Sequence, residues 1–170
     1  MHVNLGGYLK QSHTLFQLGS GLGRCGLLAH HLSPGSRIFL TDGDTDTLSQ
    51  LRRNTDQNKL DDFAENVSCH QLLWGEATAR RFLDNHCGGI HFDKMIGSDL
   101  VYVPKVVPPL FECVRTLLSR DGEFIMAHCA RREGSSVTVD MVLDGACSAG
   151  LDHSLVTEED DISVFSFRLK

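Results

Sequence analysis

A glycine-rich loop follows the first apolar run of the chain, within TLFQLGSGLGRCG at residues 14–26. Two nucleotide-binding patterns overlap in it: Gly19-x-Gly21-x-Gly23 suits an S-adenosylmethionine site, and Gly21-x-Gly23-x-x-Gly26 suits a dinucleotide site. Glycines allow the backbone to turn sharply and to approach a ligand closely, and a helix that begins behind them offers unbonded N–H groups. The loop therefore predicts a bound nucleotide without naming it. The alternative is a tight strand–helix turn that holds no ligand.

Two carboxylates follow the next apolar run, RIFLT at residues 37–41. Asp42 and Asp44 stand about 20 residues after the glycine loop, where a carboxylate can accept hydrogen bonds from both ribose hydroxyls. S-adenosylmethionine and dinucleotides share this requirement, so the pair supports a nucleoside without choosing between them. One of the two can instead cap the helix that follows, which leaves the other for the ribose.

Strands and helices alternate along the segments that must position these residues. Strands are expected at 14–18, 37–41, 66–74, 93–98 and 122–130, and helices at 23–33, 45–58, 76–86, 110–119 and 136–149. Ser33-Pro34-Gly35 ends the first helix, and Gly150 ends the last. Two more strands, 151–157 and 162–170, follow without a helix between them and are joined by the acidic turn EEDD.

This alternation predicts an α/β fold, a Rossmann-like doubly wound sheet with helices on both faces. The sheet would be mostly parallel, and the helix-free pair at the end implies one antiparallel strand. We expect all seven strands in one sheet and residues 1–170 in a single domain.

Composition narrows the class of protein. The chain has 170 residues, 41% of them apolar and 22% charged, with a net charge of −6. This is an ordinary globular composition, and its acidic balance gives no support for nucleic-acid binding. No apolar run approaches the ~20 residues of a membrane span, and the first ten residues lack the apolar core of a signal peptide.

The six cysteines include no CxxC pair, which favours buried, reduced thiols in a cytoplasmic protein over a disulfide framework. His86, Cys87 and His91 could be imagined around zinc, but no second pair has ligand spacing, so no metal is expected.

The distal half of the sequence decides between the two nucleotides. Five motifs are informative together: LGSGLGRCG (18–26), LTDGD (40–44), LRRN (51–54), LLWG (72–75) and IGSDLVY (96–102). Through them the sequence resembles the seven-strand, or class I, S-adenosylmethionine-dependent methyltransferases. More narrowly it resembles their protein-lysine methyltransferase branch, methyltransferase family 16. The expected elements also leave no substrate domain of the kind that a nicotinamide dehydrogenase needs.

The resemblance implies where S-adenosylmethionine would bind. The backbone of the glycine loop would hold its methionine portion, Asp42 rather than Asp44 would bind the ribose, and Leu73 and Trp74 would flank the adenine. The residues implied to contact the cofactor are Gln17, Gly19, Ser20, Gly21, Gly23, Asp42, Gly43, Asp44, Leu73, Trp74, Gly75, Ser98 and Asp99. For Trp74, ordinary packing is the alternative.

The resemblance also implies two catalytic residues, Asp99 and Tyr102. Asp99 would orient the acceptor amine or the cofactor, and Tyr102 would shape the acceptor channel. The alternatives are that Asp99 caps a helix and that the Tyr102 ring packs near Pro104.

Two features depart from the family pattern. Gln17 stands where the family usually has an acidic residue near the cofactor's amino group, so the charge attraction is lost and the cofactor should bind less tightly. Only residues 1–13 precede the first expected strand, whereas relatives carry a longer N-terminal section that closes the cofactor pocket.

The function that follows from the resemblance is methyl transfer to a lysine of a protein substrate. We expect the protein to act as a monomer in the cytoplasm, or also in the nucleus, without nucleic-acid or membrane partners. Two alternatives stay open: a methyltransferase for a small molecule or nucleic acid, and a non-catalytic module that binds the cofactor. Asp-Leu-Val-Tyr weakens the first, because amino-group methylases of nucleic acids favour Pro-Pro between the acidic or amide residue and the aromatic one.

Overall fold

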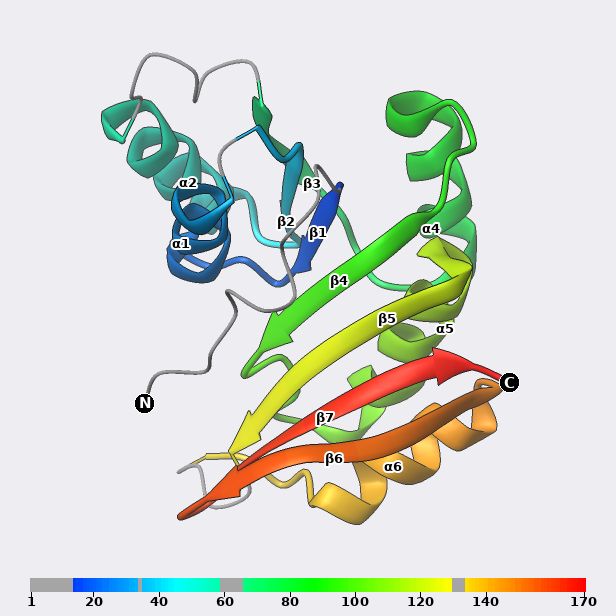
Figure 1. Ribbon diagram of the computed structural model, residues 1–170. Coiled ribbons are helices and arrows are strands. Elements are labelled where there is room, and N and C mark those ends of the chain that lie inside the picture. Colours follow the sequence, from blue (N-terminus) through cyan, green and yellow to red (C-terminus); the bar gives the residue numbers. More distant parts are fainter. Residues whose placement is uncertain (1–13, 34, 59–65, 130–133) are drawn as a thin grey trace. The chain divides into compact units, whose positions relative to one another are not determined.

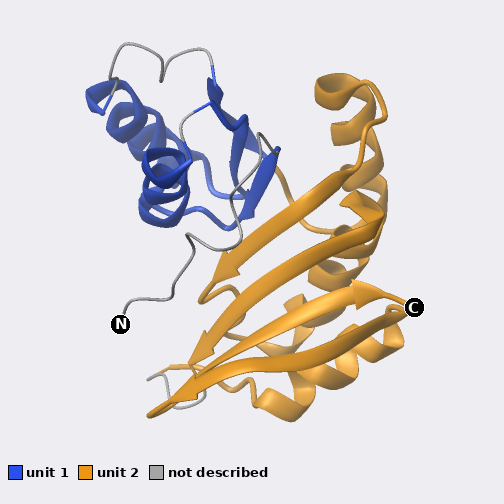
Figure 2. Ribbon diagram, in the orientation of Figure 1, with its two compact units in different colours: residues 1–71 blue, residues 72–170 orange. Residues whose placement is uncertain are grey.

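The computed structural model describes residues 14–33, 35–58, 66–129 and 134–170 (Figure 1). It divides into two units, residues 1–71 and residues 72–170 (Figure 2). Pro34 and Ala130, which end an expected helix and an expected strand, lie outside the described residues.

The described residues of the first unit form three parallel strands and the two helices α1 and α2. The strands β1 (Leu15–Leu18), β2 (Ile38–Asp42) and β3 (Val67–Gln71) lie in the order β3-β2-β1. All four residues of β1 are buried, as expected for a parallel strand covered on both faces. Helix α1 (Arg24–Leu32) follows β1, and helix α2 (Thr45–Gln57) follows β2. Every parallel strand therefore ends at the same edge, where the next loop begins.

Helix α1 lies close to β1 and β2 because Gly26 has no side chain. A Cβ at this position would overlap the side chain of Leu40 and come within 2.7 Å of Gln17 Oε1. Gly26 therefore serves helix–strand packing, the role that the third glycine has in the dinucleotide pattern. The outer side of α1 is apolar as well, with Leu28 and Leu32 about half exposed.

Within the second unit, residues 72–129 and 134–170 form four strands and several helical elements. The strands β4 (Phe92–Ser98), β5 (Leu118–Cys129), β6 (Leu151–Glu159) and β7 (Ile162–Leu169) lie in the order β4-β5-β7-β6. β4 is parallel to β5, and β7 is antiparallel to both β5 and β6. The helical elements are α4 (Glu76–Phe82), the π-helical turn η2 (Leu83–Cys87), the 3₁₀ turn η3 (Pro104–Val106), α5 (Val107–Leu117) and α6 (Val139–Ser148).

The apolar core of the second unit lies on one face of its strands. The Phe167 ring on β7 is 5.2 Å from the ring of Phe111 on α5 and 5.8 Å from the ring of Phe124 on β5. All three side chains are fully buried. Aromatic contacts of this kind contribute beyond the area that they bury, so they tie α5 to the middle of the sheet.

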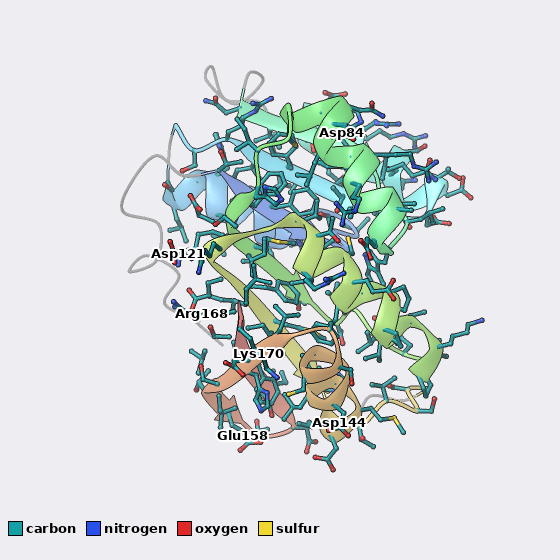
Figure 3. All side chains as sticks on the ribbon, turned by 90° about the vertical axis from the view of Figure 1, so that its right-hand side faces the viewer. Asp84, Asp121, Asp144, Glu158, Arg168 and Lys170 are labelled. Carbon is teal, nitrogen blue, oxygen red and sulfur yellow. The ribbon has the colours of Figure 1, made fainter. Side chains whose placement is uncertain are left out.

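An ion-pair network occupies the other face. Glu123 on β5 is buried and accepts hydrogen bonds from Lys94 Nζ at 2.8 Å, Ser166 Oγ at 2.6 Å and Arg168 Nη2 at 2.8 Å. Arg168 is labelled in Figure 3. Burial raises the pKa of Glu123, but these hydrogen bonds outweigh it and lower the pKa to about 2. The network joins β4, β5 and β7.

The strand order β3-β2-β1-β4-β5-β7-β6 confirms the expected mostly parallel seven-strand sheet with one antiparallel strand, β7. Several boundaries were wrong. β3 ends at Gln71 instead of Trp74, and β5 begins at Leu118, which had been assigned to the preceding helix. Helix α5 begins at Val107, before both prolines, because the first turn of a helix needs no N–H from proline.

Two more helices differ from expectation at one end. The segment that follows Gly75 is α-helical only to Phe82 and then continues as the π-helical turn η2. The last helix begins at Val139 instead of 136, because the Thr138 hydroxyl caps it by accepting a hydrogen bond from Met141 N at 3.3 Å.

All six cysteines carry free thiols. The expectation of buried thiols is confirmed for Cys113 alone, because Cys147 is exposed and the other four cysteines are partly exposed. Within the described ranges, no helix combines the length and the apolar character that crossing a membrane requires.

Candidate functional site

The glycine loop of the first unit turns through three residues with positive φ. Gly19, Gly21 and Gly23 have φ values of 53°, 54° and 85°, a left-handed region that residues with a Cβ rarely adopt. Gly23 is also the N-cap of α1. Apart from Gly21 and its two chain neighbours, no heavy atom of the described residues lies within 4 Å of the place that a Cβ would take there, so the backbone is open. The loop can therefore approach a ligand closely.

Asp42 and Asp44 have different roles in the structure. Asp42 Oδ2 accepts a hydrogen bond from Gly21 N at 3.0 Å, and its Oδ1 accepts one from Asp44 N at 3.0 Å. Asp44 Oδ1 instead accepts from Thr47 N at 2.7 Å and caps α2. The hydrogen bonds of Thr47 lower the pKa of Asp44. Only Asp42 thus faces the glycine loop, and each of its oxygens retains capacity for another donor.

Two buried hydroxyls hold the loop to the ends of β1 and β2. Ser20 Oγ donates to Gln17 O at 3.3 Å and accepts from Thr41 N at 3.0 Å, while Thr41 Oγ1 donates to Gln17 O at 2.8 Å. Gly43, between the two aspartates, accepts a hydrogen bond through its carbonyl from Gln71 Nε2 at 3.0 Å. Nothing in the local pattern distinguishes Thr41 or Gln71, because both are ordinary polar residues at strand ends.

Gln17 is buried, and its side-chain oxygen has no hydrogen-bond partner among the described residues. A buried acceptor without a donor is uncommon and is costly if it stays unmatched. The oxygen therefore fits a ligand that brings an N–H donor to it. An uncharged amide attracts an ammonium less strongly than a carboxylate does.

Leu73 and Trp74, which the sequence predicted to flank the adenine, lie in the second unit between β3 and α4, outside any strand. Leu73 is 60% exposed and Trp74 is half-buried. Thr78 Oγ1 donates to Leu73 O at 2.6 Å and to Gly75 O at 2.8 Å, so the first turn of α4 fixes this segment. Gly75, with φ 134°, is the N-cap of α4. The segment presents apolar side chains to solvent on a backbone that is held in place.

Asp99 follows β4 directly and has a left-handed backbone with φ 61°. Its N–H donates to Ala127 O at 3.0 Å, which holds it against the end of β5. The next helical turn, η3, has Val103 as its N-cap without a side-chain hydrogen bond, so the alternative that Asp99 caps this helix is wrong. Positive φ is uncommon outside glycine, although aspartate adopts it more readily than most residues do, and such residues are concentrated at functional sites.

Ser98 and Tyr102 belong to the same turn. Ser98 is exposed, and the Tyr102 side chain is 37% exposed. The carbonyl of Tyr102 accepts a hydrogen bond from Ser136 N at 3.0 Å. The structure thus brings Ser98, Asp99 and Tyr102 together at the carboxyl edge of β4 and β5, where the sequence predicted them.

Sequence reasoning missed a buried histidine beside this turn. His128 on β5 is 2% exposed and follows Ala127, whose carbonyl binds Asp99. Burial lowers the pKa of His128, and a hydrogen bond with the Val137 backbone partly opposes this. The imidazole is therefore neutral near pH 7 and ties β5 to the segment that holds Tyr102. A single histidine in an apolar strand carries no signal of such a role.

A pocket of about 310 Å³ lies at the opposite edge of the second unit, beside the amino ends of β4 and β5. Its lining includes Arg80, Asp84, His91 and Arg115. Glu76 already binds both arginines, Arg80 at 2.7 Å and Arg115 at 3.2 Å. The pocket is far in the topology from Asp99 and adds nothing to this site. Among the described residues, no three His, Cys, Asp or Glu side chains gather as metal ligands.

Comparisons with known proteins agree with one another. Residues 3–144 match a family model described as lysine methyltransferase. The protein-lysine N-methyltransferase EFM3 of Chaetomium thermophilum is 27% identical over 154 residues, which cover 81% of this chain and 45% of that protein. The protein N-lysine methyltransferase METTL21A of Xenopus tropicalis is 24% identical over 142 residues, which cover 84% of this chain and 61% of that protein.

The chain thus matches between 45% and 61% of the length of these two relatives. Among solved structures, the glycopeptide N-methyltransferase MtfA complexed with sinefungin superimposes with a TM-score of 0.69 over 98% of this chain and 91% of its own, at 12% identity. A structural similarity at such low sequence identity shows a shared fold, and this fold agrees with the strand order described above.

Proposed function

The chain belongs to the lysine methyltransferase family, and we propose from this membership that it transfers a methyl group from S-adenosylmethionine to a lysine side chain of a protein. The observation that carries the proposal is the family match over residues 3–144, because it includes both the glycine loop and the Asp99 turn. The names of the two relatives, both protein-lysine methyltransferases, support the same acceptor.

The residues of the first unit fit S-adenosylmethionine. The open backbone at Gly21 would lie against its methionine portion, and the unmatched oxygen of Gln17 would accept a hydrogen bond from its amino group. Asp42 would accept the ribose hydroxyls, because its carboxylate already faces the loop and has lone pairs left. Gly19, Ser20 and Gly23 would shape the loop, Gly43 would connect the two aspartates, and Asp44 would remain the helix cap.

The residues of the second unit would serve the adenine and the acceptor. Leu73 and Trp74, ahead of Gly75, would flank the adenine, and Ser98 would face the amino-acid portion of the cofactor. Asp99 would orient the incoming amine, and Tyr102 would line its channel. S-adenosylmethionine, when bound, supplies a methyl group on a positively charged sulfur.

The chain's own contribution would be alignment and exclusion of water. A lysine amine has an ordinary pKa of ~10.4 and must lose a proton before it can attack. An apolar channel lowers that pKa, whereas the Asp99 carboxylate opposes the change. We therefore assign Asp99 to orientation of the amine, and the released proton to solvent.

We propose further that the substrate is a protein, that the enzyme acts as a monomer and that residues 1–170 form a single domain. Its six free thiols support a reducing compartment, for which we propose the cytoplasm.

Two measurements test the function. Calorimetry with S-adenosylhomocysteine and with NAD should give binding only for the first, and the reverse result would end the methyltransferase proposal. Incubation with methyl-labelled S-adenosylmethionine and a cell lysate should then label protein at lysine. If the label appears in small molecules or nucleic acid instead, the proposed substrate class is wrong. If the cofactor binds but no methyl group is transferred, the chain is a non-catalytic module.

A further inference from the structure

The motif LRRN at residues 51–54 has no role in the site described so far. It lies on helix α2, whereas the cofactor loop precedes helix α1. Yet the Asn54 side chain reaches back to that loop: its Nδ2 donates a hydrogen bond to Leu22 O at 3.0 Å. Leu22 stands between Gly21 and Gly23, at the centre of the turn.

Leu51, one helical turn earlier, contacts the same turn. It is fully buried, and its Cδ1 lies 2.5 Å from the place that a Cβ would take at Gly23. Residues three apart on a helix share a face, so Leu51 and Asn54 meet the loop together. The spacing of the motif thus corresponds to one apolar contact under Gly23 and one hydrogen bond to Leu22.

The two residues before Leu22 have other anchors, whereas the Leu22 carbonyl is held by Asn54. Ser20 is anchored by its N–H to Thr41 O at 2.7 Å, and Gly21 is anchored to Asp42. Leu22 has a side chain that is 50% exposed, so burial of that side chain does little to hold it. Its neighbours on both sides are glycines, which have the most backbone freedom to lose.

We propose that Asn54 is a positioning residue that holds the glycine loop in its ligand-binding conformation. The inference rests on the proposed function for its ligand, S-adenosylmethionine, but the contact that carries it stands on the structure of the loop. Without the Asn54 bond the turn samples more conformations, and binding has to restore the productive one at a cost in affinity.

Two substitutions separate this role from simple packing. Asn54→Ala removes the donor, and Asn54→Asp keeps the shape but turns an oxygen toward the Leu22 carbonyl. We expect affinity for S-adenosylhomocysteine to fall by about 2- to 10-fold in the alanine variant, the range of one net hydrogen bond, and further in the aspartate variant. Amide hydrogen exchange of Gly21 and Gly23 should become faster in both.

Asn58 offers a matched control on the same helix. Its Nδ2 also donates to a backbone carbonyl, that of Asn54 at 2.7 Å, but it is bound within the helix end. Asn58→Ala and Asn58→Asp should leave ligand affinity and loop exchange unchanged, even if they lower the melting temperature.

The outcomes are distinct. Wild-type affinity and wild-type loop exchange in both Asn54 variants would overturn the inference, and so would equal effects from the Asn58 variants. An aspartate variant that binds better than the alanine variant would also overturn it, because packing alone would then explain the site. If the wild type binds no S-adenosylhomocysteine, faster loop exchange in the Asn54 variants alone would still support the positioning role while the proposed cofactor fails.

Discussion

Asp42 and Asp44 cannot be told apart by their sequence positions, but their hydrogen bonds give them different roles. Asp42 binds the backbone of the glycine loop, and Asp44 caps α2. We expect Asp42→Ala to weaken binding of S-adenosylhomocysteine by roughly ten- to a hundred-fold, because two hydrogen bonds to a charged acceptor are lost. Calorimetry measures the affinity.

Asp44→Ala is the internal comparison. It removes a helix cap, so the melting temperature should fall while the affinity stays close to that of the wild type. If Asp44→Ala weakens the affinity more than Asp42→Ala does, with both variants folded, the ribose ligand has been assigned to the wrong aspartate.

Asp99 allows its backbone and its charge to be tested separately. Asparagine tolerates a left-handed backbone about as well as aspartate does, whereas alanine there costs roughly 1–2 kcal/mol. Asp99→Asn should therefore keep the melting temperature and slow single-turnover methyl transfer, by up to about a hundred-fold if the amine is misplaced by ~1 Å. Asp99→Ala should lower both stability and turnover.

Tyr102→Phe belongs to the same series, because it removes only the hydroxyl of a side chain that is 37% exposed. Wild-type turnover in both Asp99→Asn and Tyr102→Phe would mean that neither residue is catalytic. A large fall in the melting temperature of Asp99→Asn would instead favour a structural role for its carboxylate.

For single residues, the sequence indicated well which positions belong to the candidate site. It indicated less well which role each of them has. Spacing located Asp42 and Asp44 but could not divide the ribose and capping roles, because both lie at the same strand–helix junction. Asn54 reaches the glycine loop, and Gln71 reaches Gly43, only after the chain has folded, across 32 and 28 residues. No local pattern can indicate such contacts.

For helices and strands, the sequence predicted the type of each element well and the residues at which it begins and ends less well. The capped helix α2 and the parallel strands β1 and β2 follow directly from local signals, namely a capping acid and short apolar runs. Leu118 was assigned to a helix because it continues an apolar face, although its partner Phe92 on β4 draws it into a strand. Strand pairing in the folded protein set this boundary, because the local sequence suits both a helix and a strand.

The Glu123 network predicts how the strands of the second unit respond to acid. The folded-state pKa of Glu123, about 2, lies below the unfolded value of 4.5. Its contribution to stability is therefore complete above pH 4.5 and is lost as the pH falls toward 2. Glu123→Gln should lower the free energy of unfolding at pH 7 by on the order of 2 kcal/mol, since Lys94 and Arg168 partly face solvent.

Urea unfolding at pH 7, 4 and 3 measures this effect. The difference in free energy of unfolding between the wild type and Glu123→Gln should become smaller as the pH falls. The control is Glu112→Gln on α5, because Glu112 is exposed, and its free energy of unfolding should stay close to that of the wild type at each pH. A gap that stays constant with pH would contradict the assignment of the shifted pKa to this carboxylate.

Across the whole molecule, the thiols report how tightly each part is packed. Burial raises the pKa of Cys113 to about 12, and it also raises the pKa values of Cys25 and Cys69. Because the thiolate is the reactive form, Cys147 should be alkylated first at pH 8 and Cys113 only on unfolding. Peptide mass spectrometry of timed samples gives the order, and early alkylation of Cys113 in folded protein would contradict the packing around α5.

The long outer strand β6 bears on how the purified protein behaves in solution. Residues 152–160 are all exposed, and the edge of a sheet offers backbone groups that can pair with a second molecule. Asp152, Glu158 and Glu159 repel such a partner, and the irregularity between Leu155 and Thr157 bends the edge away from it. Replacing those three carboxylates by the neutral amides Asn and Gln removes the repulsion, so such a variant should associate at neutral pH at concentrations at which the wild type does not.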